Sequence, residues 1–167
     1  MAADGTGGQT KTKPHAVVIP YPLQGHVIPV AHLALRLAAR GFTVTFVNTE
    51  SVHQQTARAL GVDRQSYNIF AGARASSRER PDVRYELVSD GFPLGFDRSL
   101  NHDQFMEGVL HVLPAHVEEL LRRVVLDPAS TCLVADTFFV WPATLARELS
   151  VPYVFAMRVH HTYLWIE

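Results

Sequence analysis

Residues 15–49, HAVVIPYPLQGHVIPVAHLALRLAARGFTVTFVNT, decide the fold of this chain. The stretch begins with an apolar run that suits a strand buried on both faces, and Pro20 and Pro22 end it. From residue 27, apolar residues recur at helical spacing up to Gly41, and residues 42–47 then alternate β-branched and aromatic side chains. This order predicts a strand, a loop, a helix and a second strand, joined as a right-handed crossover.

The rest of the chain repeats this alternation. A second helix is expected to end near residues 60–61, a strand to cover 83–88, and a long amphipathic helix to follow Asn101, with Pro114 kinking it or splitting it in two. Residues 131–135 and 151–155 predict two further buried strands, separated by a helix over about 141–149. Strands that alternate with helices in this way predict an α/β doubly wound parallel sheet with helices on both faces.

Two segments lack such patterns. The polar, Gly/Thr-rich residues 1–13 have no apolar core of a signal peptide and are expected to form a disordered tail. Residues 62–82 are rich in Arg, Ser, Gly and Ala without sustained periodicity, which is typical of a surface insertion or a mobile loop.

The composition excludes several classes of partner. Of the 167 residues, 15 are Lys or Arg and 16 are Asp or Glu, so no bulk charge favours nucleic acid or an anionic membrane. No apolar run approaches the roughly 18 residues of a membrane span. The single cysteine, Cys132, gives neither a disulfide nor a zinc set. We therefore expect a soluble, cytoplasmic chain.

Ligands of open α/β sheets bind outside the carboxyl ends of the strands, and two of the loops expected there carry titratable side chains. His26 begins a helix, whose positive dipole end disfavours the imidazolium and keeps the ring able to accept a proton. Asp136 ends a later strand. If the two loops are neighbours, the Asp136 carboxylate can bond one ring nitrogen and stabilise the charge that develops on the other.

Simpler interpretations of these residues stay open. A histidine at a helix start is often a solvated or capping residue, and an aspartate after a strand often caps the next helix. The other histidines lack the convergent spacing of a metal set, and the adjacent pair His160 and His161 has no third ligand nearby in sequence.

Two common active-site motifs are missing. No Gly-x-Gly-x-x-Gly follows the first strand, which weakens a dinucleotide-binding interpretation. There is also no Gly-x-Ser-x-Gly elbow and no Ser or Cys beside His26, so acyl-enzyme chemistry lacks its attacking atom. A base without its own nucleophile suggests that the substrate brings one. Several aromatic residues near the same strand ends could line an apolar pocket or belong to the core: Phe92, Phe96, Phe138, Phe139 and Trp141.

Several segments together resemble a known family. They are PLQGHVIP at 22–29, the helix up to Gly41, FTVTFVNT at 42–49, SDGFP at 89–93, LVADTF at 133–138, and the helix 143–149 followed by Val151-Pro152. In this order and spacing, over about residues 14–156, the chain resembles the N-terminus of the plant UDP-dependent glycosyltransferases.

The resemblance implies the N-terminal part of a GT-B fold, which pairs two Rossmann-like domains, one for the acceptor and one for the UDP-sugar. It implies that His26 deprotonates a hydroxyl of a small lipophilic metabolite, that this hydroxyl receives a hexose with inversion, and that Asp136 orients His26. It also implies a UDP-sugar as co-substrate, with no metal and no further cofactor. The residues that would border the acceptor are Gln24, Gly25, Phe92, Phe138 and Trp141.

The family's UDP-sugar signature does not occur in this sequence, and residues 158–167 depart from the pattern of the family. We therefore expect residues 14–167 to form an incomplete acceptor-binding domain that lacks the C-terminal donor domain and is inactive alone. One alternative is a non-catalytic fragment that at most binds a small apolar ligand or a partner. A nicotinamide-dependent oxidoreductase is a further alternative, on fold grounds only.

Overall fold

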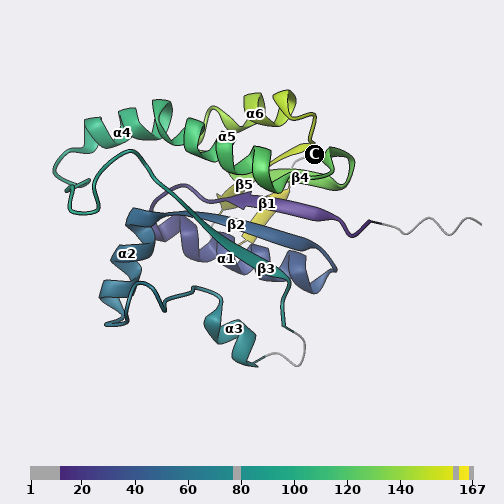
Figure 1. Cartoon of the computed structure of the whole chain (residues 1–167), viewed down its shortest axis with the longest axis horizontal. Coiled ribbons are helices and arrows are strands. Elements are labelled where there is room, and N and C mark those ends of the chain that lie inside the picture. The colour runs from purple at the N-terminus through teal and green to yellow at the C-terminus, as the bar shows by residue number, and fades with distance from the viewer. Residues whose placement is uncertain (1–11, 77–79, 160–161, 166–167) are drawn as a thin grey trace, which may run out of the picture.

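A computed structural model describes residues 12–76, 80–159 and 162–165 (Figure 1). Its helices and strands follow one another in the predicted alternation. In chain order they are β1 (His15–Ile19), α1 (Gln24–Ala39), β2 (Thr43–Thr49), α2 (Glu50–Ala59), α3 (Ala71–Ser76), β3 (Val83–Val88), α4 (His102–His111), α5 (Leu113–Val124), a 3-10 turn (Pro128–Ser130), β4 (Thr131–Asp136), α6 (Pro142–Glu148), β5 (Tyr153–Val159) and β6 (Thr162–Trp165).

The strands form one sheet in the order β3-β2-β1-β4-β5-β6. The first five are mutually parallel, and β6 pairs with β5 antiparallel. β1 lies between β2 and β4, with Val17 opposite Thr45 on one side and Leu133 on the other. The chain leaves β1 toward β2 and returns on the other side of β1 at β4. This reversal opens a crevice beyond the carboxyl ends of β1 and β4.

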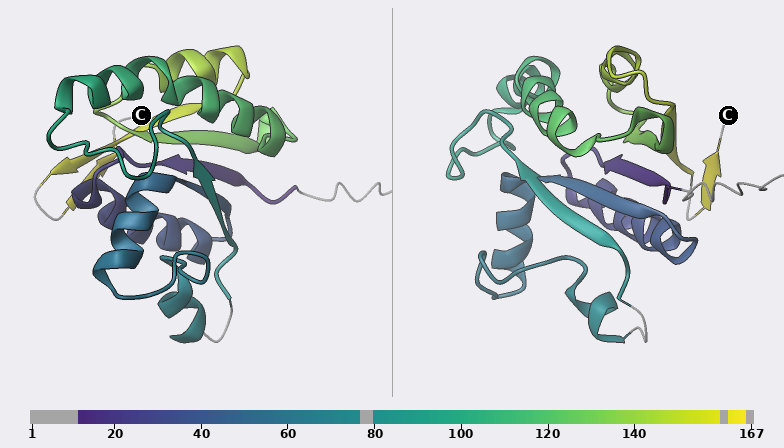
Figure 2. Two further views of the ribbon diagram at one scale, coloured as in Figure 1. Left: turned by 60° about the vertical axis from the view of Figure 1, so that its left-hand side comes forward. Right: turned by 45° about the vertical axis from the view of Figure 1, so that its right-hand side comes forward.

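Helices cover both faces of the sheet (Figures 1 and 2). α4, α5 and α6 lie on one face, where Val17, Val47 and Leu133 join a core cluster with Leu113 and Leu121. α1 and α2 lie on the other face, where alternate strand residues pack against their apolar sides in a second cluster. The alternation of inward positions along each strand produces these two cores and accounts for strands that are apolar on both sides.

Two helix boundaries follow from proline. The amphipathic stretch after Asn101 forms two helices that meet at Val112, and Pro114 lies in the first turn of α5, where its missing N–H costs no helical hydrogen bond. The split that Pro114 predicted is therefore confirmed. α1 begins at Gln24 rather than after His26, so that Pro29 falls within the helix instead of in its first turn.

Residues 62–76 are more ordered than their composition suggests. They include the short helix α3, and just before it Phe70 is buried and meets the Phe46 ring edge-on at 5.1 Å. His53 is also buried here and bonds the carbonyl of Arg64 at 2.9 Å. Most of residues 62–73 lie at the surface, as the composition predicts, but Phe70 anchors the segment on Phe46 of β2 and His53 ties Arg64 to α2.

The predicted tail over residues 1–13 falls mostly outside the described residues. Lys13, which is described, lies 2.6 Å from Asp82 as an ion pair. In the described part of the chain, none of the helices combines the length and the apolar character required to cross a membrane.

Candidate functional site

His26 and Asp136 meet at the crevice between β1 and β4. His26 lies in the first turn of α1, directly after the β1 loop, and Asp136 is the last residue of β4. The Nδ1 atom of His26 is 2.8 Å from Oδ2 of Asp136, although the two residues are 110 positions apart. The side chains are 18% and 6% exposed, so the pair is largely shielded from solvent and still reachable. The contact proposed from sequence is thus present in the structure.

The hydrogen bonds of Asp136 fix the tautomer of His26. Oδ1 of Asp136 accepts the backbone N–H of Phe138 at 3.0 Å, and Oδ2 faces Nδ1 of His26. An ionised carboxylate can only accept, so Nδ1 carries the hydrogen and donates it. The remaining ring nitrogen, Nε2, then holds a lone pair in the neutral imidazole. The arrangement can therefore accept a proton at Nε2 and stabilise the imidazolium that results.

Aromatic side chains surround the imidazole. The Phe138 ring meets it edge-on at a centroid distance of 4.9 Å, and the Tyr21 ring lies 5.5 Å away. Burial raises the pKa of the Tyr21 hydroxyl, and the charge of Asp136 raises it further. Tyr21 therefore stays protonated and remains a donor, here toward the sulfur of Met106 at 3.2 Å. These rings keep water away from one side of His26.

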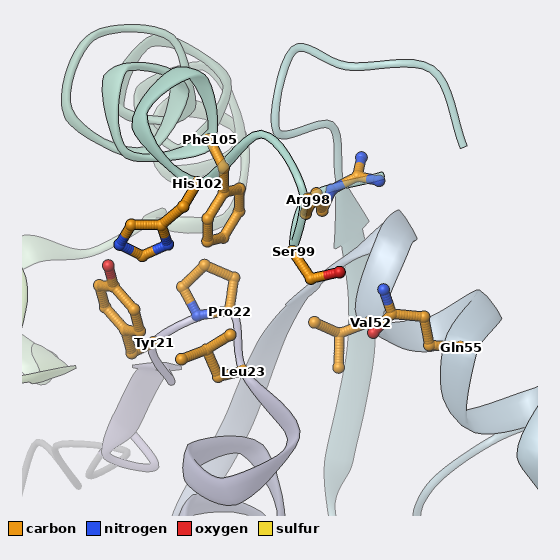
Figure 3. Close-up of a pocket in the computed structure, with 9 residues that line it drawn as sticks. All are labelled: Tyr21, Pro22, Leu23, Val52, Gln55, Arg98, Ser99, His102 and Phe105. Atoms are coloured by element: carbon orange, nitrogen blue, oxygen red, sulfur yellow. The ribbon is translucent and has the colours of Figure 1, made fainter. Parts of the chain in front are cut away.

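A pocket of about 420 Å³ opens next to Tyr21, a size within the usual range for small-molecule sites (Figure 3). It extends from the β1 loop across α2 to the segment that precedes α4. Its lining is formed by Tyr21, Pro22, Leu23, Val52, Gln55, Arg98, Ser99, His102 and Phe105. His26 and Asp136 are not part of this lining; Tyr21 lines the pocket and its ring lies 5.5 Å from the His26 ring, so one side chain separates the pocket from the dyad of His26 and Asp136.

The residues expected to border an acceptor occupy two kinds of environment. Phe138 is 66% exposed, and Gln24 and Gly25 are exposed at the start of α1. Trp141, in contrast, belongs to the core: its indole N–H donates to the carbonyl of Val109 at 3.0 Å. Phe92 is half-buried, stacked on another ring and packed against helix α4. Three of the five residues are therefore exposed and two are packed against α4, and none of the five lines the pocket of about 420 Å³.

A second charged group at this edge of the sheet was not foreseen. Asp90 follows β3, is buried, and receives Nε of Arg98 at 2.6 Å and Nη2 at 2.8 Å. The Ser51 hydroxyl donates to the same carboxylate at 2.9 Å, and the backbone of Phe92 at 3.3 Å. Burial acts against ionisation of Asp90, but the bonds from Arg98 and Ser51 outweigh it and lower the pKa. The one sequence signal was an aspartate in a turn after a strand, with an arginine eight positions on.

The described part of the chain contains no group of three or more His, Cys, Asp or Glu side chains that could hold a metal ion. The pair His160 and His161 lies outside the described residues.

Residues 14–159 match the model of a family described as glycosyltransferase, N-terminal domain. Two relatives from Arabidopsis thaliana, UDP-glycosyltransferases 86A1 and 86A2, are 56% and 51% identical to this chain over 138 residues. These alignments cover 81% and 82% of the chain but only 27% of each relative.

Solved structures agree at the level of the fold. A UDP-glucose:anthocyanidin 3-O-glucosyltransferase, crystallised with UDP, superposes with a TM-score of 0.62 at 23% identity. The match covers 88% of this chain and 30% of that one. The predicted Rossmann-like parallel sheet with helices on both faces, part of the N-terminal domain of a GT-B fold, is confirmed.

Proposed function

The chain belongs to the glycosyltransferase family that this N-terminal domain defines, and from that membership we propose that it is the acceptor-binding part of an inverting UDP-glycosyltransferase. Its substrate would be a hydroxyl group on a small lipophilic metabolite, and the transferred group a hexose from a UDP-sugar. The observation that carries this proposal is the 2.8 Å contact between Nδ1 of His26 and Asp136, which leaves Nε2 as a base, with Tyr21 between the His26 ring and the pocket.

In the proposed reaction, Nε2 of His26 removes the proton of the acceptor hydroxyl as its oxygen attacks the anomeric carbon of the sugar. The bond from that carbon to the UDP oxygen breaks, UDP leaves with the electron pair, and the configuration inverts. Asp136 balances the charge of the imidazolium and holds the ring in place. No nucleophilic side chain is required, because the acceptor supplies the attacking atom.

The walls of the crevice support an apolar acceptor. In the proposal, Gln24, Gly25 and Phe138 border the bound molecule, while Phe92 and Trp141 hold the wall behind it. The lining of the pocket, which these five residues do not form, includes Leu23 and Val52, so that a lipophilic body would gain by leaving water. The UDP-sugar is a co-substrate in this scheme, and the mechanism calls on no metal.

The chain spans about 27% of the length of the two relatives, so sugar transfer is proposed for a protein in which this domain is joined to a donor-binding domain. The 167 residues alone are proposed to bind an acceptor without transferring sugar, and a cytoplasmic location stays a prediction. The oxidoreductase alternative rested on the fold alone, and the family membership does not support it.

The experiment replaces the matching N-terminal part of UDP-glycosyltransferase 86A1 by this chain and measures acceptor-dependent UDP release with a panel of phenols, flavonoids and terpenoid alcohols. Substituting His26→Ala should reduce the rate by roughly two to four decades, the usual contribution of a positioned base.

The matched control is His32→Ala, an exposed histidine further along α1, which should leave the rate unchanged. A chimera that keeps its full rate after His26→Ala would overturn the assignment of the base.

A further inference from the structure

The pocket beside the dyad has one formally charged side chain within its apolar lining. Tyr21 and His102 lie on one side of the pocket, and Arg98 and Gln55 on the other (Figure 3). Tyr21 contacts the His26 ring, so the Arg98 side is the end remote from the base. A guanidinium at that position would ordinarily recruit a carboxylate on the far end of a bound molecule.

The hydrogen bonds of Arg98 prevent such recruitment. Nε and Nη2 donate to the two oxygens of Asp90, and Nη1 donates to the carbonyl of Phe96 at 2.9 Å. Nη2 also approaches the carbonyl of Phe92 at 3.4 Å. These bonds use the N–H of Nε, both N–H groups of Nη2 and one of the two on Nη1, and the bidentate geometry with Asp90 is the one that carboxylates favour.

Asp90 also cancels the charge. Its carboxylate is 2% exposed and stays ionised, since its bonds lower its pKa. The field that an incoming group meets on this side is therefore that of a neutral pair rather than of a cation. An anionic group would lose its hydration on entering the pocket and gain at most one N–H of an already neutralised guanidinium in return.

From this geometry we infer that the acceptor is uncharged at its far end, and that Asp90, acting through Arg98, is the residue that determines this selection. Asp90 does not touch the acceptor and is a positioning residue. The inference rests on the proposed function, because it names the class of molecule that the acceptor pocket takes: an uncharged lipophilic hydroxyl compound rather than a hydroxy acid.

The test uses three rigid probes that differ only at one end: 4,4′-biphenol, which is neutral, 4′-hydroxybiphenyl-4-carboxylate, and 4′-(aminomethyl)biphenyl-4-ol, which is cationic. Their affinities for the 167-residue chain are measured by titration calorimetry near neutral pH. The neutral probe should bind at least about tenfold more tightly than either charged probe, since a buried unpaired charge is costly.

Asp90→Asn then removes the compensating charge and leaves Arg98 cationic. The carboxylate probe should gain affinity until it equals or exceeds the neutral probe, while the cationic probe weakens further. Ser51→Ala is the matched control: it removes one hydrogen bond to Asp90 without changing any charge, so the preference for the neutral probe should persist.

The possible results distinguish failure of the inference on charge selection from failure of the proposed function. If the wild-type chain binds the neutral and carboxylate probes equally well, or if folded Asp90→Asn keeps the wild-type ratio, the inference on charge selection is wrong and acceptor binding stands. If no probe binds, the proposed function itself is contradicted. Should Asp90→Asn fail to fold, the affinities of the wild-type chain for the three probes still decide.

Discussion

Two aspartates at the carboxyl ends of strands in the same sheet have different roles. Asp136 is the last residue of β4 and Asp90 follows β3, which β2 and β1 separate from β4, and both are buried beside a basic side chain. Among the described residues, Asp136 bonds one side chain, that of His26, and leaves the other ring nitrogen of His26 outside this contact. Asp90 bonds two, those of Arg98 and Ser51, and the guanidinium that pairs with it is bonded to further carbonyl groups.

The two pairs differ in whether the basic side chain has further hydrogen bonds to the protein. The network of Asp90 uses the donors that surround it to tie a loop and the start of α2 to the end of β3, which stabilises one wall of the pocket. The network of Asp136 leaves one atom of the pair able to accept a proton. In this chain, the buried pair that keeps a ring nitrogen able to accept a proton is the candidate for chemistry. The buried pair whose donors are bonded to protein oxygens has a structural role.

The largest effect is expected for Asp136→Asn in the chimera. Phe138 N–H requires an acceptor at Oδ1, so the new amide must direct its NH₂ group at Nδ1 of His26. That bond moves the ring hydrogen to Nε2 and removes the base. Transfer should fall by roughly two to four decades with the fold unchanged, as judged from urea unfolding. Activity within tenfold of wild type would show that Asp136 does not set the tautomer.

Asp90→Ala should mainly affect stability. The substitution leaves Arg98 buried without its carboxylate, and breaking a buried pair in this way costs about 3–5 kcal/mol of unfolding free energy. Urea unfolding of the 167-residue chain measures it. Asp103→Ala, at an exposed position in α4, serves as the control and should change little. A loss as small as that of the control would show that the Asp90 network contributes no stability.

The pH dependence of unfolding tests the contribution of the ionised Asp90 to stability. The pKa of Asp90 in the folded chain lies below its ordinary value of 3.8, so its contribution to stability is present above that value. It is lost as the pH falls through the lower, folded-state pKa. The wild type should therefore lose more stability than Asp90→Asn on acidification below about pH 4. Parallel curves for the two proteins would exclude the linkage.

The smallest effect is expected for Ser51→Ala, which deletes one hydrogen bond from the Asp90 network. The expected cost is about 1 kcal/mol in the same urea experiment, with Asp90 still bonded to Arg98. A loss as large as that of Asp90→Ala would mean that Ser51, and not Arg98, holds the wall.

The sheet was predictable because β1, β2 and β4 are buried on both faces and alternate with amphipathic helices, although Asn101, the expected cap of α4, makes no side-chain capping bond. The division of the long amphipathic stretch into α4 and α5 was predictable from Pro114 alone, because its ring cannot continue a helix. The segment before α3 was not predictable, because Phe70 is one aromatic residue without a periodic pattern, and only the tertiary fold reveals that it packs on Phe46. The antiparallel pairing of β6 depends likewise on partners that no local pattern specifies.

The site was predictable in part for the same reason. His26 and Asp136 both follow apolar strands, and strand order alone brings two such loops together. The pair of Asp90 and Arg98 depends on how an irregular loop closes, which residue spacing does not determine. Trp141 was expected near the acceptor, but a large indole gains more from burial under α4, where Val109 accepts its N–H.

The central claim is that His26 acts as a base, and the acidity of the acceptor tests it most directly. The chimera and its His26→Ala variant are compared with an ordinary phenol and with trichlorophenol, which is largely ionised at neutral pH and needs no base. His26→Ala should lose roughly two to four decades with the phenol and less than about one decade with trichlorophenol. Equal losses with the two acceptors would contradict the account, because His26 would then act on binding or folding instead of on the proton.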